Sequence, residues 1–385
     1  MKKYIIYLFL ACSLVSCANK NVESVKVDYK EIDLVSAVEK TERKNIETYC
    51  KHISYVKLET KDDVLLKSPS YEFTSNSIIA YEGAFIYQFS YKGEYLNSYV
   101  NHGQGPKDLL GINKVLWDEN RQLLYVLDGA LGKMLILDEN LNYQGYKPYR
   151  VPEHRSEICG DYIYSGLERD DYRKMYQSAV VRYHIPSANC DTLFKSTIPY
   201  CEAKEFPMFS FGTKLSFSDS VFYFREHRSD TIFSFTPVDN VKRFAYSLNV
   251  GETYPPELDY NHRSRRDLYD YLVVGDCVYC DDFIIVSYSY KDESLAQAVF
   301  DKKTGETFCL RNFPNNGIDG GLPIRFIKKV KGKTYYSGQI FPGIHLTDEF
   351  KSRVKFYQPW GGKLSDILST TLDDDNPILM FVEIK

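Results

Sequence analysis

The chain has 385 residues, with 48 lysines and arginines against 52 aspartates and glutamates, and a formal net charge of −4 at pH 7. This acidic balance argues against nucleic acid as a partner, because phosphate backbones are bound by basic surfaces. The 33 tyrosines and 23 phenylalanines, set against 22 glycines and 15 prolines, favour a folded, strand-rich chain over a disordered one.

The first segment, MKKYIIYLFLACSLVSCANK, has the plan of a secretory signal peptide. Two lysines precede an apolar run from Tyr4 to Val15, which is too short to span a bilayer as a permanent helix. Residues 14–17, Leu-Val-Ser-Cys, resemble the lipobox of bacterial lipoproteins, whose cysteine is acylated and becomes the first mature residue. We therefore predict a signal peptide over residues 1–16 and lipidation at Cys17, with an ordinary signal peptide and a chance cysteine as the alternative.

Residues 17–31 are polar, lack apolar periodicity and are predicted to form a lipidated tether. No later stretch approaches about 18 consecutive apolar residues, so we expect the membrane to be reached through the lipid anchor alone. Ala18, Asn19 and Lys20 follow the cysteine, without the acidic cluster that resembles a surface-export signal. This favours a place in the cell envelope, at the periplasmic face of the outer membrane rather than at the cell surface.

Beyond the tether, the chain is predicted to be a series of strand units with few helical stretches. Six copies of a strand-turn-strand pattern begin at Ile78, Lys114, Glu157, Leu215, Val273 and Ile324. In each of the first five copies, an apolar or aromatic residue precedes the turn near the end of the copy, and these residues can be aligned with one another. They are separated by 48, 46, 52 and 65 positions, and they are Phe89, Leu137, Tyr183, Phe235 and Phe300. A unit of roughly 40 to 50 residues with four strands is typical of a β-propeller blade.

The two ends of this domain offer a way to close a ring of blades. HISYVKLET, residues 52–60, and NPILMFVEIK, residues 376–385, are both strand-like, so one can complete the blade begun by the other. Closure of this kind removes open sheet edges, which would otherwise promote aggregation. We predict an all-β fold over residues 32–385: a six-bladed β-propeller with four-stranded blades, closed by pairing of its N- and C-terminal strands.

The wide gap between the fourth and fifth copies contains YPPELDYNHRSRRDLYDYL, which is predicted to be an insertion with a short helix from Arg265 to Leu272. Guanidinium groups in this segment could bind carboxylates or sulfated glycans. The candidate ligand-binding residues are His262, Arg263, Arg265 and Arg266. A solvated helix face is the alternative, since most charge runs of this kind are exposed.

With these elements in place, nearly all of the chain after residue 30 resembles the six-bladed β-propeller lipoproteins of Bacteroides-type bacteria, which are related in fold to NHL-type and TolB-type propellers. The resembling stretches are YVKLET (55–60), GQGPKDLL (103–110), LLYVLD (123–128), LDENLNYQG (137–145) and DDDNPILMFVEIK (373–385). Members often carry a GxGPGE-type turn after the first blade, and here Lys107 and Asp108 replace its Gly and Glu. The resemblance implies a fold and transfers no catalytic signature.

The glycine-rich stretch NHGQGPKDLLGINKV, residues 101–115, is a candidate phosphate loop. A dinucleotide motif requires a third glycine where Asp108 stands, and a P-loop requires lysine after a glycine, where Pro106 stands. Both motifs also need a helix that starts at the loop, whereas a strand pattern follows here. We therefore predict a structural turn between blades, formed by Gly103, Gly105 and Pro106.

Two further stretches, a CxxC pair and an acidic DDDN segment, are weak candidates for redox or metal chemistry. Cys277 and Cys280 form a CxxC, but a zinc site needs a second close pair, so buried or unpaired cysteines are favoured over a local disulfide or a metal. DDDN, residues 373–376, could supply oxygen ligands for calcium, and a solvated turn is the favoured alternative. No motif indicates a cofactor, and calcium alone is left open.

The sequence contains no GxSxG elbow, no HExxH zinc helix and no sialidase-type Asp box, so binding is favoured over catalysis. We predict a binding or scaffold domain whose ligand is a glycan or a partner protein of the envelope, because propeller loops converge on one rigid face. The alternative is a hydrolase, lyase or lactonase with a metal or paired carboxylates at the channel mouth. Three or more inward Asp, Glu, Asn or His side chains would favour this enzyme, and an apolar or tyrosine-lined mouth would favour binding.

Overall fold

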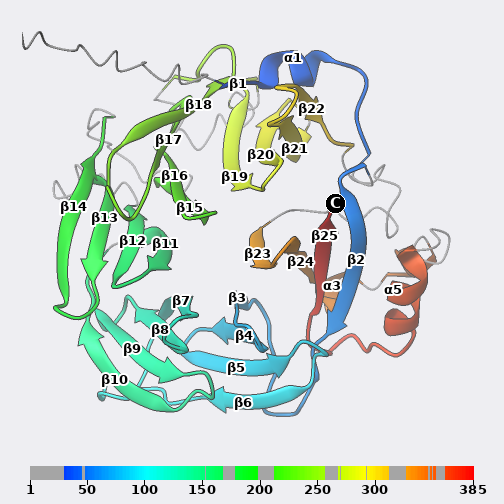
Figure 1. The fold of residues 1–385 in the computed structure, drawn as a ribbon. Helices are drawn as coiled ribbons and strands as arrows, with labels where there is room; N and C mark the ends of the chain where they lie inside the picture. The colour runs from blue at the N-terminus through cyan, green and yellow to red at the C-terminus, as the bar shows by residue number, and fades with distance from the viewer. Residues whose placement is uncertain are drawn as a thin grey trace, which may run out of the picture.

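Six antiparallel sheets surround a central opening, so the prediction of an all-β, six-bladed propeller is confirmed (Figure 1). The computed structural model describes residues 30–45, 48–151, 153–167, 178–197, 212–255, 268, 270–291, 293–311, 327–345, 347–348, 350–352 and 360–385. Each blade has four antiparallel strands, which lie side by side from the central opening to the outer surface. The blades are numbered here in chain order.

The first three blades follow one another without exchange of strands. Blade 1 consists of β3 (Ser70–Phe73), β4 (Ser77–Glu82), β5 (Phe85–Ser90) and β6 (Tyr95–Tyr99). Blade 2 consists of β7 (Ile112–Asp118), β8 (Leu123–Asp128), β9 (Lys133–Asp138) and β10 (Tyr143–Pro148). Blade 3 consists of β11 (Glu153–Cys159), β12 (Tyr162–Leu167), β13 (Ser178–His184) and β14 (Asn189–Lys195).

The other three blades each involve the N-terminal segment at their outer side. Blade 4 consists of β15 (Lys214–Ser218), β16 (Val221–Arg225), β17 (Thr231–Phe235) and β18 (Arg243–Asn249). Blade 5 consists of β19 (Val273–Tyr279), β20 (Phe283–Tyr290), β21 (Glu293–Asp301) and β22 (Thr307–Cys309). Blade 6 consists of β23 (Lys328–Lys331), β24 (Thr334–Ile340), β25 (Ile378–Ile384) and β2 (Cys50–Lys57).

The ring closes by the pairing that the sequence predicted. β2 pairs antiparallel with β25, with Ile53 opposite Val382, so strands from the two ends of the domain share blade 6. The first copy of the repeat starts earlier than the sequence indicated, because β3 precedes Ile78. Its four residues carry too short an alternation to be recognised as a strand from the sequence alone.

The aligned apolar position of the repeat has the same structural role in every blade. Phe89, Leu137, Tyr183, Phe235 and Phe300 lie on the third strands and are at most 2 % exposed. Each stands opposite the second residue of the neighbouring strand, as Phe89 does with Ile78. The same register places Val382 opposite Tyr335 in blade 6. Apolar side chains at this position fill the space between adjacent blades, which explains why the repeat persists.

The N-terminal segment runs along the outer edges of blades 4, 5 and 6 (Figure 1). It starts with β1 (Lys30–Asp33), which adds a parallel fifth strand to blade 4, and continues to Lys44, which forms a parallel bridge beside β22. Arg43 donates from Nη1 to Tyr288 Oη at 2.7 Å and from Nη2 to Glu293 Oε1 at 3.0 Å. The segment therefore covers sheet edges that would otherwise be open to other chains.

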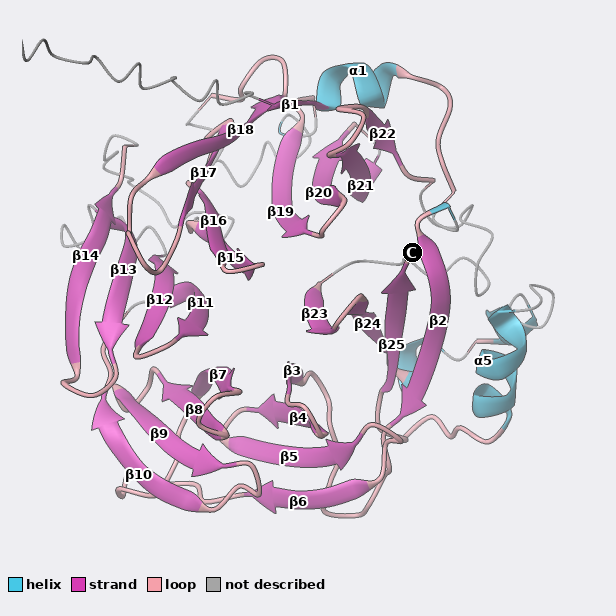
Figure 2. Cartoon of the chain, viewed as in Figure 1, coloured by secondary structure: helices cyan, strands magenta, loops and turns pink. Residues whose placement is uncertain are grey.

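The helices with described bounds are α1 (Leu34–Glu39), α3 (Pro342–His345) and α5 (Trp360–Ser369). Figure 2 shows α1 and α5 at the outer side of the ring of strands. Leu364 and Leu368 of α5 pack against Ile340 and Ile378 of blade 6. Both α3 and α5 belong to the connection between β24 and β25, an insertion that the sequence analysis did not predict. None of the helices in the described part of the chain combines the length and the apolar character needed to cross a membrane.

Candidate functional site: the central channel

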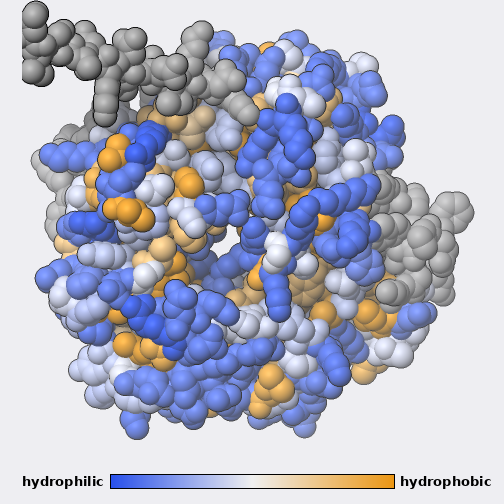
Figure 3. All heavy atoms as spheres, viewed as in Figure 1, coloured by the Kyte–Doolittle hydropathy of each residue, from blue (hydrophilic) through white to orange (hydrophobic). Residues whose placement is uncertain are grey.

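The innermost strands of the six blades border the central opening: β3, β7, β11, β15, β19 and β23. Figure 3 shows this opening as a narrow channel at the centre of the face in view, with mostly hydrophilic residues around it. A channel of this kind collects side chains from every blade on a rigid frame. It is therefore the first place to look for a site.

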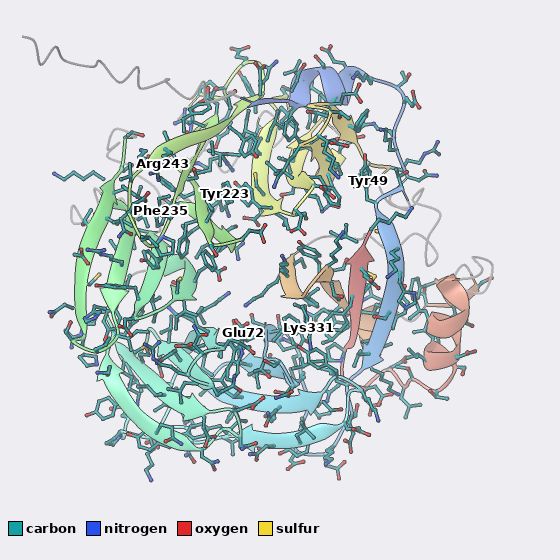
Figure 4. The ribbon with its side chains drawn as sticks, viewed as in Figure 1. Tyr49, Glu72, Tyr223, Phe235, Arg243 and Lys331 are labelled. Carbon is teal, nitrogen blue, oxygen red and sulfur yellow. The ribbon has the colours of Figure 1, made fainter. Side chains whose placement is uncertain are left out.

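Charged side chains from all six innermost strands interact with one another around the channel. Blades 1, 3 and 5 supply carboxylates and blades 2, 4 and 6 supply lysines, so the sign alternates from blade to blade. The residues, in blade order, are Glu72, Lys114, Glu157, Lys214, Asp276 and Lys328, and blade 3 adds Arg155. We call these seven residues the channel ring. Glu72 is among the residues labelled beside the opening in Figure 4.

Part of the channel ring is closed by direct ion pairs between blades. Lys328 donates to the buried carboxylate of Glu72, which joins blades 6 and 1. Asp276 accepts from Arg155 Nη2 at 3.1 Å, and its other oxygen lies 3.3 Å from Lys214 Nζ, which joins blades 3, 4 and 5. Burial lowers the pKa of Lys214, and Asp276 opposes that effect by stabilising the ammonium form.

Glu157 of blade 3 interacts electrostatically with members of the channel ring from blades 1, 2 and 6. Burial raises the pKa of its carboxyl group, and Glu72 acts in the same direction through repulsion. The cations Lys328, Lys114 and Arg155 oppose the rise. Because the pKa of Glu157 remains raised, its carboxyl group is protonated more readily than that of an exposed glutamate.

Arg225 fixes the backbone of the channel wall at blade 5. Its Nη2 donates to the carbonyl oxygens of Val274 at 2.9 Å and Gly275 at 2.7 Å, and its Nη1 donates to Ser229 O at 3.2 Å. Tyr223, labelled in Figure 4, stacks on Tyr279 with ring centroids 4.1 Å apart. These contacts hold β19 against blade 4, so that Asp276 keeps its position in the channel ring.

The residues predicted from the sequence to bind a ligand or a lipid lie outside the described part of the chain. This applies to His262, Arg263, Arg265 and Arg266 in the insertion and to Cys17 in the N-terminal segment. The charged residues of the channel ring were not singled out from the sequence. A usable signal is present in some of the copies, since Lys114 stands among apolar residues in INKVLWD and Asp276 does so in VVGDCVY.

The structure places Gly103, Gly105 and Pro106 in the connection between β6 and β7, which leads from blade 1 to blade 2. The N–H of Gly105 donates to Asp108 Oδ2 at 2.7 Å, and its carbonyl accepts from Lys133 Nζ at 2.8 Å. A Cβ on Gly103, whose φ is +154°, would lie 2.5 Å from the same Asp108 oxygen. The loop is thus packed around its own carboxylate, and these backbone groups are engaged in that packing.

The DDDN stretch and the CxxC pair were the two other candidate sites, and the structure shows what their side chains contact. Within the DDDN stretch, Asp375 forms an ion pair with Lys57 at 2.6 Å, and Asn376 is buried with its amide fully engaged. Cys277 and Cys280 are both free and buried, and they belong to core clusters on opposite sides of blade 5. Burial raises the pKa of each thiol to about 11, which is typical of unreactive cysteines.

No group of three or more His, Cys, Asp or Glu side chains suited to a metal occurs among the described residues. The channel ring contains three carboxylates, but cations stand between them. The described channel wall therefore matches neither the carboxylate cluster expected for a metal enzyme nor the apolar or tyrosine-lined mouth. Charged and paired side chains line it instead.

Comparisons with known proteins agree with this fold. The family model described as "Domain of unknown function (DUF4934)" matches residues 29–383. A solved structure of a candidate exported protein from Bacteroides fragilis has a TM-score of 0.67 and 16 % identity, covering 93 % of this chain and 99 % of its own. A member of the DUF4221 family from Bacteroides vulgatus has a TM-score of 0.54 and 9 % identity, covering 87 % and 97 %. No curated protein sequence matches the chain.

Proposed function

The chain belongs to the DUF4934 family, and we propose that it is a lipid-anchored protein of the cell envelope whose propeller binds a polar ligand in its central channel. The observation that carries the proposal is the channel ring, in which all six blades direct charged side chains to one place. Partly desolvated charges of this kind cost free energy unless they are paired, so they are expected where a ligand uses them.

The ligand is a glycan or a partner protein of the envelope, since both present polar groups that can enter a hydrophilic channel mouth. We also propose that the propeller is related in fold to NHL-type and TolB-type propellers, and that the protein is located at the periplasmic face of the outer membrane. Support comes from the first 17 residues, which resemble a signal peptide with a lipobox, and from the similar fold of a candidate exported protein from Bacteroides fragilis.

Thermal unfolding of the purified protein, with and without ligands, tests the binding function. A panel of neutral and acidic oligosaccharides, peptidoglycan fragments and divalent metals should contain a ligand that raises stability in a saturable way. A ligand at a hundredfold excess over its Kd adds about 2.7 kcal/mol. Asp276→Asn should remove the shift and Asp239→Asn should keep it, since Asp239 forms its ion pair with Arg243 on an exposed turn. A shift that survives both Asp276→Asn and Lys114→Met, which remove charges from different sides of the channel ring, would place binding outside the channel.

Substitution of Cys17 tests the lipid anchor. Cys17→Ser should abolish acylation and move the protein from the membrane fraction to the soluble fraction, because each buried methylene of an acyl chain contributes about 0.8 kcal/mol. Mass spectrometry of the N-terminal peptide checks the modification, and Cys12→Ser is the control for a cysteine inside the signal peptide. An unmodified Cys17 in the wild-type protein would refute the anchor.

A further inference from the structure

Exposed apolar side chains gather on one face of the propeller. Consecutive strands of a blade are antiparallel, so the connections between blades and those between the second and third strands lie on the same face. The insertion between β24 and β25 lies there too, and we call this side the insertion face. Five large apolar residues on it are 38 % to 66 % exposed, and we call them the apolar strip: Leu65, Phe85, Val100, Leu110 and Leu372.

A buried hydrogen bond holds the two leucines at the blade 6 end of the strip on one surface. Asn376 Oδ1 accepts from Leu66 N at 2.8 Å, although the two residues are 310 positions apart in the chain. Leu65 directly precedes Leu66, and Leu372 belongs to the same turn as Asn376. The connection from blade 6 to blade 1 therefore lies against the end of the insertion.

The strip continues from Leu65 into blade 1. Ser68 N donates to Glu82 Oε1 at 3.0 Å, and Glu82 stands opposite Phe85 in the pairing of β4 with β5. The register of β5 and β6 brings Val100 to the same end of the blade as Phe85. Blade 1 thus adds two exposed apolar side chains next to those from blade 6.

The loop between blades 1 and 2 completes the strip. The ring of His102 lies 6.4 Å from that of Phe85, and His102 forms a parallel bridge with Leu109. Leu109 is fully buried, whereas the next residue, Leu110, is exposed. Single apolar side chains at a surface are ordinary, but a row of them across three blades is typical of an interaction site.

Carboxylates flank the two leucines at the blade 6 end. Four exposed ones have no hydrogen bond or ion pair within the described part of the chain: Asp62, Asp63, Asp373 and Asp374. The nearby Lys57 and Lys61 are already paired, with Asp375 at 2.6 Å and with Glu59 at 3.6 Å. Exposed Lys67 offsets one of the four charges. This end of the strip is therefore negative, and its carboxylates are available to cations from outside.

We infer that the apolar strip docks a segment of a partner protein in which large aliphatic side chains stand next to lysines or arginines. The aliphatic groups of the partner cover the strip and remove its apolar surface from water. The cations pair with the carboxylates at the blade 6 end and set the direction in which the segment lies. A bilayer surface fits less well, because anionic headgroups would repel the same carboxylates. No residue of the channel ring takes part, so this docking is independent of the ligand in the channel.

Selection from a random peptide library on the purified full-length protein tests the inference. The selected peptides should combine Lys or Arg with Leu, Ile or Phe. The double variant Leu65→Ser/Leu372→Ser should lower their affinity at least about tenfold. Asp63→Asn/Asp373→Asn should lower it about threefold at about 50 mM salt and less at about 500 mM, because salt screens exposed charges.

Val238→Ser is the matched control and should keep the full affinity. It also replaces an exposed aliphatic residue, 94 % exposed, but on the connection between the third and fourth strands of blade 4, on the opposite face. All of the substituted side chains are exposed, so the thermal unfolding curves of the variants should match that of the wild type.

Four results would overturn the inference. The first is a selection that yields no peptide, or peptides without cations. The second is an affinity that neither double variant changes. The third is a dimer, detected by sedimentation, that Leu65→Ser/Leu372→Ser dissociates, because the strip would then join two copies of this chain. The fourth is binding of the full-length Cys17→Ser protein to vesicles of phosphatidylethanolamine and phosphatidylglycerol that is lost with the same two leucines, because the strip would then contact lipid.

Discussion

Replacing Val382 with aspartate should leave no folded protein at 25 °C. Val382 is fully buried in β25, between Ile53 of β2 and Tyr335 of β24. A carboxylate at this position would have no partner in the apolar cluster between blades 5 and 6. Burial of an unpaired charge costs several kcal/mol, against a total stability of about 5–15 kcal/mol for most proteins. Since β25 also carries the closing pair, the whole ring depends on it.

Circular dichroism and urea unfolding would measure this loss. Glu383→Ala provides a matched control, because Glu383 is the next residue and its ion pair with Lys51, at 2.7 Å, lies at the surface. Exposed ion pairs contribute up to about 1 kcal/mol, so this variant should unfold close to the wild type. If Val382→Asp unfolded at the same urea concentration as Glu383→Ala, closure through β25 would not be what holds the ring together.

The repeat was predictable because one apolar position per blade has a fixed task. Phe89 and Phe300 are separated by more than 200 residues, yet both occupy the same place on a third strand and fill a gap between blades. The closure was predictable for a related reason, since an unpaired strand at each end of a propeller has only the other end as a partner. These features depend on local patterns, which the sequence displays directly.

The channel ring could not be predicted in the same way, because its pairs join positions far apart in the chain. Glu72 and Lys328 meet only after the ring has closed. The strand of Glu72, SYEF, still carried a signal, since a charge between aromatic residues on an inner strand requires a polar environment. Lys328 stands among other lysines in KKVK and carried no such signal. The helices α3 and α5 are a different case: they interrupt blade 6 between β24 and β25 and break the spacing on which the repeat was recognised.

The CxxC pair shows how strand geometry limits an interpretation based on spacing. Cys277 lies within β19 and Cys280 directly after it, and successive side chains of a strand alternate between its two faces. Residues three positions apart therefore point in opposite directions, and the two thiols enter different core clusters. The interpretation as buried, unpaired cysteines is confirmed for both.

Asn376 illustrates a structural role that its sequence context concealed. In the stretch DDDN it was grouped with carboxylates as a possible calcium ligand or as part of a solvated turn. The side chain is instead 1 % exposed. Its Oδ1 accepts from Leu66 N at 2.8 Å, and its Nδ2 donates to Glu59 O at 2.9 Å and to Val64 O at 2.7 Å. The amide thus holds the loop from blade 6 to blade 1 against the start of β25.

Asn376→Ala should therefore destabilise the protein by about 2–4 kcal/mol, because it leaves one buried N–H and two carbonyl groups without their partner. Urea unfolding measures the change. Asp374→Ala, at an exposed position of the same stretch, should stay within about 0.5 kcal/mol of the wild type. Calcium separates the two interpretations of the stretch. If the amide oxygen were a calcium ligand, calcium would stabilise the wild type and not Asn376→Ala. Since Oδ1 is already bonded to Leu66, we expect calcium to leave both unfolding curves unchanged.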